Sequence, residues 1–188
     1  MKNYKKNLEL LTKNHVYSQE MEHDACGVGL IASTEGKKSR EVVEYGIEAL
    51  KAVWHRGAVD ADGKTGDGAG IHVEIPKDFF IEKIEVTGHD YDNSEICVGM
   101  IFLPRNDYAS QETCKTIVES ELTKNNFIIY GWRQVPVNPK VLGEKAFQTM
   151  PEIIQVLFKP NDLNLINKDL ERKIYETRKK IENKAFDL

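Results

Sequence analysis

Residues 95–103, EICVGMIFL, form a nearly continuous apolar run. An apolar run of this length that does not alternate with polar residues predicts a strand that is buried on both faces. A strand of this kind fits inside a layered structure rather than at the surface of an open sheet. We therefore expect helices or a second sheet to pack against it.

The rest of the chain supplies further elements in mixed order. Strands are predicted over residues 26–33, 70–76, 126–137 and 152–158, the third with a bend at Gly131. Helices are predicted from the cap residue Ser39 onward, over 77–84 as a short helix, and over 109–124 and 168–186. Because strands and helices are interspersed with few tight hairpins, the sequence predicts an α+β fold.

Length and charge narrow the class of protein. The 188 residues suffice for one domain with a real core. The formal net charge is −4, so no basic surplus exists to neutralise phosphates, and we expect no nucleic-acid partner. Nothing approaches 18 consecutive apolar residues, and the run Leu8-Glu9-Leu10-Leu11 is too short for a signal-peptide core. We therefore expect no membrane partner and a cytoplasmic location.

The cysteines and histidines give no support for a metal site or a disulfide framework. Cys26, Cys97 and Cys114 are far apart, and no C-x-x-C or H-x-x-x-H spacing occurs. Cys97 and Cys114 sit in apolar patterns and are predicted to lie in the core. Cys26 differs, because Gly27 and Gly29 leave its backbone open to close approach. On these grounds alone it is either a buried structural cysteine or a nucleophile.

A loop that holds five glycines and three aspartates covers residues 55–70, HRGAVDADGKTGDGAG. It fails the phosphate-loop pattern, which needs glycine where Ala58 stands, and it fails the calcium-loop pattern. The dinucleotide pattern beginning at Gly27 is matched only weakly, with Ala32 in place of the third glycine. The composition predicts a loop with several positions suited to positive φ.

Four stretches together resemble a known family. They are HDACGVGLIAS at 23–33, HRGAVDADGKTGDGAGI at 55–71, GWRQVPV at 131–137 and EKAFQTMPEIIQVLF at 144–158. They resemble the start of the glutamine amidotransferase domain of the glutamate synthase large-subunit family. That domain is a class II amidotransferase of the N-terminal-nucleophile hydrolase type. The resemblance extends from about residue 22 to 158 and is looser to 188.

The resemblance implies a fold and a processing step. The fold would be part of a four-layer αββα sandwich of the N-terminal-nucleophile hydrolase type, incomplete in these residues. Residues 1–25 would be a propeptide, removed by cleavage between Ala25 and Cys26. Residues 26–188 would then be the N-terminal part of the amidotransferase domain.

The resemblance also implies catalytic residues. Cys26 would attack the side-chain amide of L-glutamine, form a γ-glutamyl thioester and release ammonia. Arg56 and Gly57 match the family's arginine–glycine pair, and we interpret Arg56 as positioning Cys26. The alternative is a structural arginine paired with Asp60 or Asp62. The nearby glycines Gly66, Gly68 and Gly70 would set the backbone shape, with Asp67 as a turn residue.

Cofactors and partners follow from the complete enzyme that the resemblance implies. A synthase domain of the same full-length chain would add the ammonia to 2-oxoglutarate and use FMN and an iron–sulfur cluster. We assign neither cofactor to these residues, and we expect no metal here. A small electron-donating subunit is a further candidate partner.

The chain departs from the family in one respect that bears on activity. It contains no Asn-Gly dipeptide, which the family uses in its oxyanion hole, and we expect the substrate-binding arginine and aspartate to lie beyond Leu188. We therefore expect the 188 residues alone to be inactive or nearly so. Two alternatives stay open: a truncated, non-catalytic binding or regulatory module, and the glutaminase domain of another class II amidotransferase.

Overall fold

The computed structural model describes residues 6, 9–10, 12–13 and 27–186. The chain divides into two compact units, Met1–Gly57 and Ala58–Leu188, and each is described by itself. Within the described residues, no helix has the length and apolar character needed to cross a membrane.

The first unit contains the helix α2 (Arg40–Ala52) and the short 3-10 helix η1 (Trp54–Arg56). The hydroxyl of Ser39 accepts a hydrogen bond from the backbone N–H of Val42 at 3.4 Å, which confirms the predicted cap. Residues 27–33 were expected to form most of a strand, but the structure assigns no strand to them. A strand exists only through its hydrogen-bonded neighbours, and apolar composition does not supply the neighbour.

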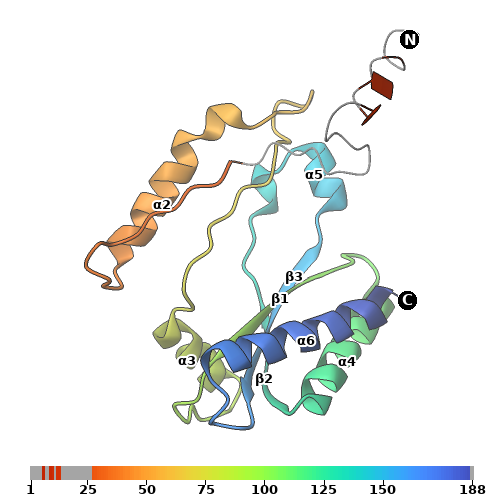
Figure 1. The fold of residues 1–188 in the computed structure, drawn as a ribbon. Coiled ribbons are helices and arrows are strands. Elements are labelled where there is room, and N and C mark those ends of the chain that lie inside the picture. Colours follow the sequence, from red (N-terminus) through yellow and green to blue (C-terminus); the bar gives the residue numbers. More distant parts are fainter. Residues whose placement is uncertain (1–5, 7–8, 11, 14–26, 187–188) are drawn as a thin grey trace. The chain divides into compact units, whose positions relative to one another are not determined.

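The second unit is built on a sheet of three antiparallel strands, β1 (Cys97–Leu103), β2 (Phe127–Gln134) and β3 (Glu152–Pro160). The strand order is β1-β3-β2, so the last strand in sequence lies in the centre (Figure 1). Cys97 pairs with Phe158, and Phe127 pairs with Pro160. β3 is buried along most of its length, as expected for a central strand.

The predicted bend in β2 is present at Gly131. The register against β3 shifts between Ile129 and Gly131, and Gly131 has φ 148°. A Cβ atom at this position would lie 3.0 Å from Cγ2 of Thr87. Glycine therefore meets two requirements here, a positive φ and a close approach.

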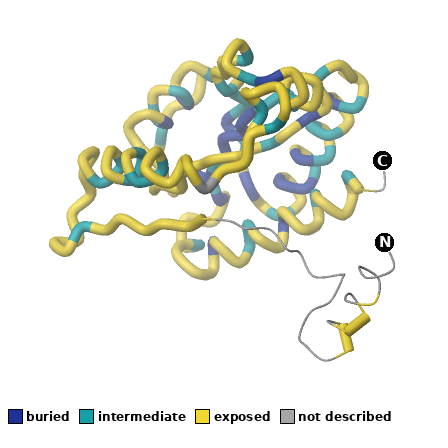
Figure 2. Tube along the Cα trace, turned by 90° about the horizontal axis from the view of Figure 1, so that it is seen from above, coloured by how far each residue is buried: buried dark blue, intermediate teal, exposed yellow. Residues whose placement is uncertain are grey.

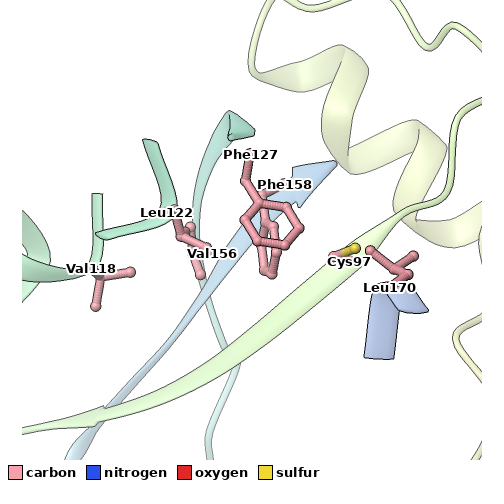
Figure 3. Packing of buried hydrophobic residues seen from close by; sticks show 7 residues of the cluster. All are labelled: Cys97, Val118, Leu122, Phe127, Val156, Phe158 and Leu170. Atoms are coloured by element: carbon pink, nitrogen blue, oxygen red, sulfur yellow. The ribbon is translucent and has the colours of Figure 1, made fainter. Parts of the chain in front are cut away.

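Two helices, α4 (Tyr108–Lys124) and α6 (Asn167–Phe186), lie beside each other and cover one face of the sheet (Figure 1). Asp107 caps α4 by accepting from the backbone N–H of Ser110 at 3.0 Å. The rings of Phe127 and Phe158 meet edge to face, 5.2 Å apart. The cluster between helices and sheet consists of Cys97, Val118, Leu122, Phe127, Val156, Phe158 and Leu170 (Figure 3).

The helix α3 (Lys77–Val86) covers part of the opposite face. Ile84 and Leu157 are fully buried there. The complete second cluster consists of Phe80, Ile84, Ile96, Tyr130 and Leu157. Buried residues gather in the sheet and the elements that flank it (Figure 2). Cys97 is buried as predicted, whereas Cys114 is only partly buried.

The expectation that residues 95–103 are buried on both faces was wrong for the face of β1 that carries Met100 and Phe102. The side chains of Met100 and Phe102 are 50% and 63% exposed. They pair across the sheet with Gln155 and Ile153, on the face that carries Leu157. α3 packs against that face around Leu157 and at Arg133 but leaves Met100 and Phe102 exposed, so apolar composition overstated the burial.

Residues 70–76 also lack the predicted strand. Ile71, Val73 and Ile75 alternate as a strand requires, but they are 46%, 44% and 37% exposed. The structure assigns no strand to this segment. Between β2 and β3 the chain forms the 3-10 helix η2 (Pro139–Val141) and the short helix α5 (Glu144–Thr149).

Candidate functional site

The proposed nucleophile and cleavage site, Cys26 and Ala25, lie outside the described residues. The backbone that follows them is described and is open. A Cβ atom added to Gly27 or Gly29 would meet no atom within 4 Å. The expectation of close approach at these glycines therefore meets no steric obstacle among the described residues.

Arg56 and Gly57 end the first unit. Arg56 is the last residue of η1, and its side chain lies outside what the structure describes. The backbone N–H of Gly57 donates to the carbonyl of Trp54 at 3.0 Å, and Gly57 itself is extended. The chain then passes directly into the glycine-rich loop.

Within the loop of residues 55–70, residues 58–67 form a hairpin. The sequence predicted only a loop there. Val59 and Gly66 form an isolated antiparallel bridge. The backbone N–H of Asp60 donates to the carbonyl of Thr65 at 2.7 Å. At its base, Asp67 Oδ2 accepts from the backbone N–H of Ala58 at 2.8 Å. The dipeptide Asp62-Gly63 at the tip is a turn signal that could have predicted this hairpin.

Asp62 organises the tip of the hairpin. Its Oδ1 accepts from the backbone N–H groups of Lys64 at 2.9 Å and Thr65 at 2.7 Å. Its Oδ2 accepts from the Thr65 hydroxyl at 2.5 Å. These hydrogen bonds, the Thr65 hydroxyl first, hold the pKa of Asp62 well below its usual range. The carboxylate is therefore ionised at neutral pH.

The hairpin also contacts α5, about eighty residues later in the sequence. Lys145 binds Asp60 with 2.6 Å between Nζ and Oδ2. Oδ2 of Asp62 lies against Gly143, where an added Cβ atom would overlap it. The two aspartates that the alternative interpretation assigned to Arg56 thus have partners within the second unit.

An apolar hollow lies beside α5. It has a volume of about 410 Å³. Its lining consists of Val137, Asn138, Pro139, Leu142, Ala146, Thr149, Met150, Pro151 and Ile153. No charged side chain is among them, so a zwitterionic ligand would find no counter-charge in this hollow. It is a poor candidate for the site of an amino-acid substrate.

Metal ligands and reactive thiols are also scarce in the part of the chain that the structure describes. No group of three or more His, Cys, Asp or Glu side chains there could hold a metal ion. Burial raises the pKa of the Cys97 thiol to about 12, with smaller contributions from Glu171 and Glu95. Cys97 is therefore a core residue without nucleophilic character at neutral pH.

Comparison with protein-family models gives a match over residues 26–188 to the class II glutamine amidotransferases. The match covers the hairpin, the sheet and all the helices from α2 onward.

Curated relatives are much longer than this chain. It is 51% identical over 179 residues to a glutamate synthase [NADPH] large chain of Azospirillum brasilense, which covers 95% of this chain and 12% of the relative. It is 38% identical over 174 residues to a ferredoxin-dependent glutamate synthase of Pyropia yezoensis, covering 92% and 11%. A glutamate synthase [NADPH] large chain of Bacillus subtilis is 34% identical over 168 residues, covering 89% and 11%.

Proposed function

Since this chain belongs to the class II glutamine amidotransferases, we propose that its reaction is hydrolysis of the side-chain amide of L-glutamine, with Cys26 as the nucleophile. The observation that carries the proposal is the family match, which begins at residue 26 and runs to residue 188. Residues 1–25 are then a leader, and cleavage between Ala25 and Cys26 makes the cysteine the first residue.

The chemistry follows from the two groups that cleavage brings together in one residue. A thiol has a reference pKa of about 8.5 and an α-amine one of about 7.7–8.0, so the amine can take the thiol proton. The thiolate attacks the amide carbon of glutamine, and the C–N bond breaks after the amine has passed a proton to the leaving ammonia. Water then hydrolyses the γ-glutamyl thioester, and glutamate and the free thiol result. Before cleavage the nitrogen of Cys26 is an amide, which is no base, and the leader is therefore inhibitory.

Arg56 and Gly57 act as positioning residues in this proposal. Arg56 orients Cys26 and its amine rather than the carboxylate of the substrate. Arg56 is the last residue of η1, and Gly57 connects it to the hairpin of residues 58–67 along the chain. We place the groups that bind the substrate's charged ends outside the hollow beside α5, because that hollow is lined by uncharged residues.

The ammonia released from glutamine is used within a larger protein. This chain spans only 10% to 12% of the length of the glutamate synthases that it matches. We propose that ammonia passes to a synthase domain of the same full-length chain, where it is added to 2-oxoglutarate. The names of the relatives specify NADPH in some cases and ferredoxin in others. An electron-donating partner is therefore part of the proposal, without a choice between the two.

FMN and an iron–sulfur cluster belong to that larger protein. The described cysteines are Cys97 and Cys114, one of them in the core. An iron–sulfur cluster is held by several thiolates together, so the described residues do not fit it. No step of the amide hydrolysis uses either cofactor.

The fold proposed for the complete domain is the four-layer αββα sandwich. One sheet with helices α4 and α6 on one face supplies two of its layers. Two observations favour a second sheet against the opposite face. Met100 and Phe102 are exposed there, and the apolar residues Ile71, Val73 and Ile75 alternate with polar ones as in a strand. Packing of apolar side chains between two such sheets is the usual way to bury both.

The proposal is tested in the full-length protein encoded by the gene. Glutaminase activity and the mass of the N-terminal peptide are measured for the parent and for Cys26→Ala, with Cys114→Ala as the matched control. We expect a mature chain that begins at Cys26, loss of glutaminase activity in Cys26→Ala and normal activity in Cys114→Ala. Full activity of Cys26→Ala would refute the assignment of the nucleophile.

A further inference from the structure

We propose that Asp62 is a positioning residue for the glutaminase reaction. It fixes the hairpin of residues 58–67 against the first turn of α5, and this hairpin follows Arg56 and Gly57 directly in the chain. This inference rests on the proposed function, because Arg56–Gly57 is the pair proposed to orient the nucleophile. The start of α5, at Gly143 and Glu144, lies more than eighty residues after Asp62 in the sequence.

The hairpin cannot hold its own position by packing. Residues 58–67 contain no buried residue, and the one large apolar side chain, Val59, is 63% exposed. A short two-stranded ribbon without an apolar face is unstable in water by itself. Its placement in the second unit therefore depends on the polar contacts that it makes.

Those contacts converge on the start of α5. Oδ2 of Asp62 lies against the backbone of Gly143, the residue before α5. The Thr65 hydroxyl, which donates to Asp62, also accepts from the backbone N–H of Ala146 at 3.5 Å. Lys145 reaches Asp60 at 2.6 Å. Thr65, held by Asp62, thus satisfies a backbone N–H group that the first turn of a helix leaves without an internal partner.

Gly143 makes this approach possible. A Cβ atom built on Gly143 would overlap Oδ2 of Asp62 and both Oγ1 and the backbone nitrogen of Thr65. The backbone conformation of Gly143 is ordinary and extended, with φ −71° and ψ 164°. The glycine is therefore required for space rather than for a special φ, which ties it specifically to the hairpin.

The base of the hairpin continues directly into the proposed catalytic pair. Asp67 binds the backbone N–H of Ala58, the residue after Gly57. A Cβ atom on Gly66 would lie 3.0 Å from the carbonyl oxygen of Ala58, so the base is closely packed. Displacement of the hairpin therefore moves Ala58, which is bonded directly to Gly57.

Substitutions at Asp62 separate the two parts of this contact. Asp62→Asn keeps one carbonyl oxygen for Lys64 and Thr65, so the turn inside the hairpin survives. Its amide nitrogen cannot accept the bond from the Thr65 hydroxyl, so Asp62 no longer holds the hydroxyl that accepts from Ala146 in α5. Asp62→Ala removes the hydrogen bonds within the turn and also the bond from the Thr65 hydroxyl. Asp107→Ala is the matched control, because Asp107 caps α4 through Ser110 in the same way and contacts no part of the hairpin.

The experiment uses the full-length protein and measures kcat and KM for glutaminase together with hydrogen exchange of the amides in residues 58–67. For Asp62→Asn and Asp62→Ala we expect kcat to fall by about 10-fold to 100-fold, the cost of a small misplacement at a reacting centre. We expect KM for glutamine to stay within about twofold, because Arg56 orients the nucleophile rather than the substrate. Exchange in the hairpin should accelerate, and Asp107→Ala should match the parent in kcat and in hairpin exchange.

Three results decide between the possibilities. If Asp62→Asn keeps the parent's kcat, or if its hairpin exchanges as slowly as the parent's, the inference is overturned. If KM rises while kcat is kept, Asp62 acts on substrate binding and the inference is equally overturned. If the processed parent has no glutaminase activity at all, the proposed function fails and the catalytic role of Asp62 fails with it, whereas the exchange data still decide whether Asp62 holds the hairpin.

Discussion

The carboxylate of Asp92 binds the ammonium group of Lys159 across 67 residues of sequence. The other carboxylate oxygen accepts from the hydroxyls of Ser94 at 2.6 Å and Tyr130 at 3.4 Å. Asp92 lies in the segment between α3 and β1, whereas Tyr130 and Lys159 lie on β2 and β3. The carboxylate therefore ties that segment to the end of the sheet.

Replacement of Asp92 by asparagine should destabilise the 188-residue chain. The variant loses an ion pair and charge-assisted hydrogen bonds, and because the Asp92 side chain is 45% exposed we expect a loss of about 1 kcal/mol. The measurement is the free energy of unfolding in urea at pH 7. Asp169→Asn, which removes the far more exposed pair with Arg172, should change the stability by less than about 0.5 kcal/mol.

The stability difference between the parent and Asp92→Asn should depend on pH. Lys159, followed by Ser94, lowers the pKa of Asp92 in the folded state. The contribution is therefore complete above the unfolded pKa of about 3.9 and is lost as the pH falls below it. Asp92 raises the pKa of Lys159, so on the alkaline side the contribution persists to about pH 10.4 and is lost above it. A difference that stayed constant from pH 7 down to pH 2 would contradict the ion pair.

The two faces of the sheet should respond differently to the loss of a phenylalanine. Phe158 is 4% exposed and belongs to the cluster under α4 and α6, so Phe158→Ala should cost about 3–5 kcal/mol. Phe102 is 63% exposed, and Phe102→Ala should cost less than about 0.5 kcal/mol in the 188-residue chain. If a second sheet covers this face in the full-length protein, Phe102→Ala should cost several times more there. Equal small costs in both proteins would argue against the sandwich.

Gly131→Ala should destabilise the chain by about 1–3 kcal/mol. Alanine is strained at φ 148°, and its Cβ would lie 3.0 Å from Cγ2 of Thr87. The double variant with Thr87→Ser removes that methyl group and keeps the hydroxyl that donates to Ile84 at 2.6 Å. Chemical denaturation should show partial recovery in the double variant. No recovery would assign the whole cost to the backbone.

Cys97 should resist alkylation as long as the chain is folded. Its pKa of about 12 leaves a thiolate fraction on the order of 10⁻⁴ at pH 8, and the side chain is 4% exposed. Iodoacetamide at pH 8 followed by peptide mass spectrometry should leave Cys97 unmodified in buffer and modify it in 6–8 M urea, about the range that unfolds small domains. Rapid labelling in buffer would show that the core cluster opens.

The elements with strong local patterns were predictable from the sequence. α2 and α4 follow apolar spacing, α6 is a charged stretch with few large apolar residues, and the Ser39 cap was identified together with its helix. The strands β1, β2 and β3 follow apolar runs, and Gly131 located the bend in β2. In each case the residues that decide the structure lie within one element.

The features that the sequence did not reveal depend on partners far away in the chain. The exposure of Met100 and Phe102 is set by how far α3 extends over the sheet, which no pattern in β1 encodes. Residues 27–33 and 70–76 have strand-like composition, but pairing is a property of two segments. In the candidate site, the contact of Asp62 with α5 and the need for glycine at 143 join positions about eighty residues apart.

The central place of β3 has a consequence for the order of events during synthesis. β1 and β2 each pair with β3, so neither strand can form these hydrogen bonds until β3 has been synthesised. β3 ends at Pro160. A ribosome that adds about 5–20 residues per second needs several seconds to pass from the end of β1 to the end of β3. During that interval the apolar residues of β1 are exposed and not yet paired with β3. Exposed apolar segments of this kind are where nascent chains aggregate or bind chaperones.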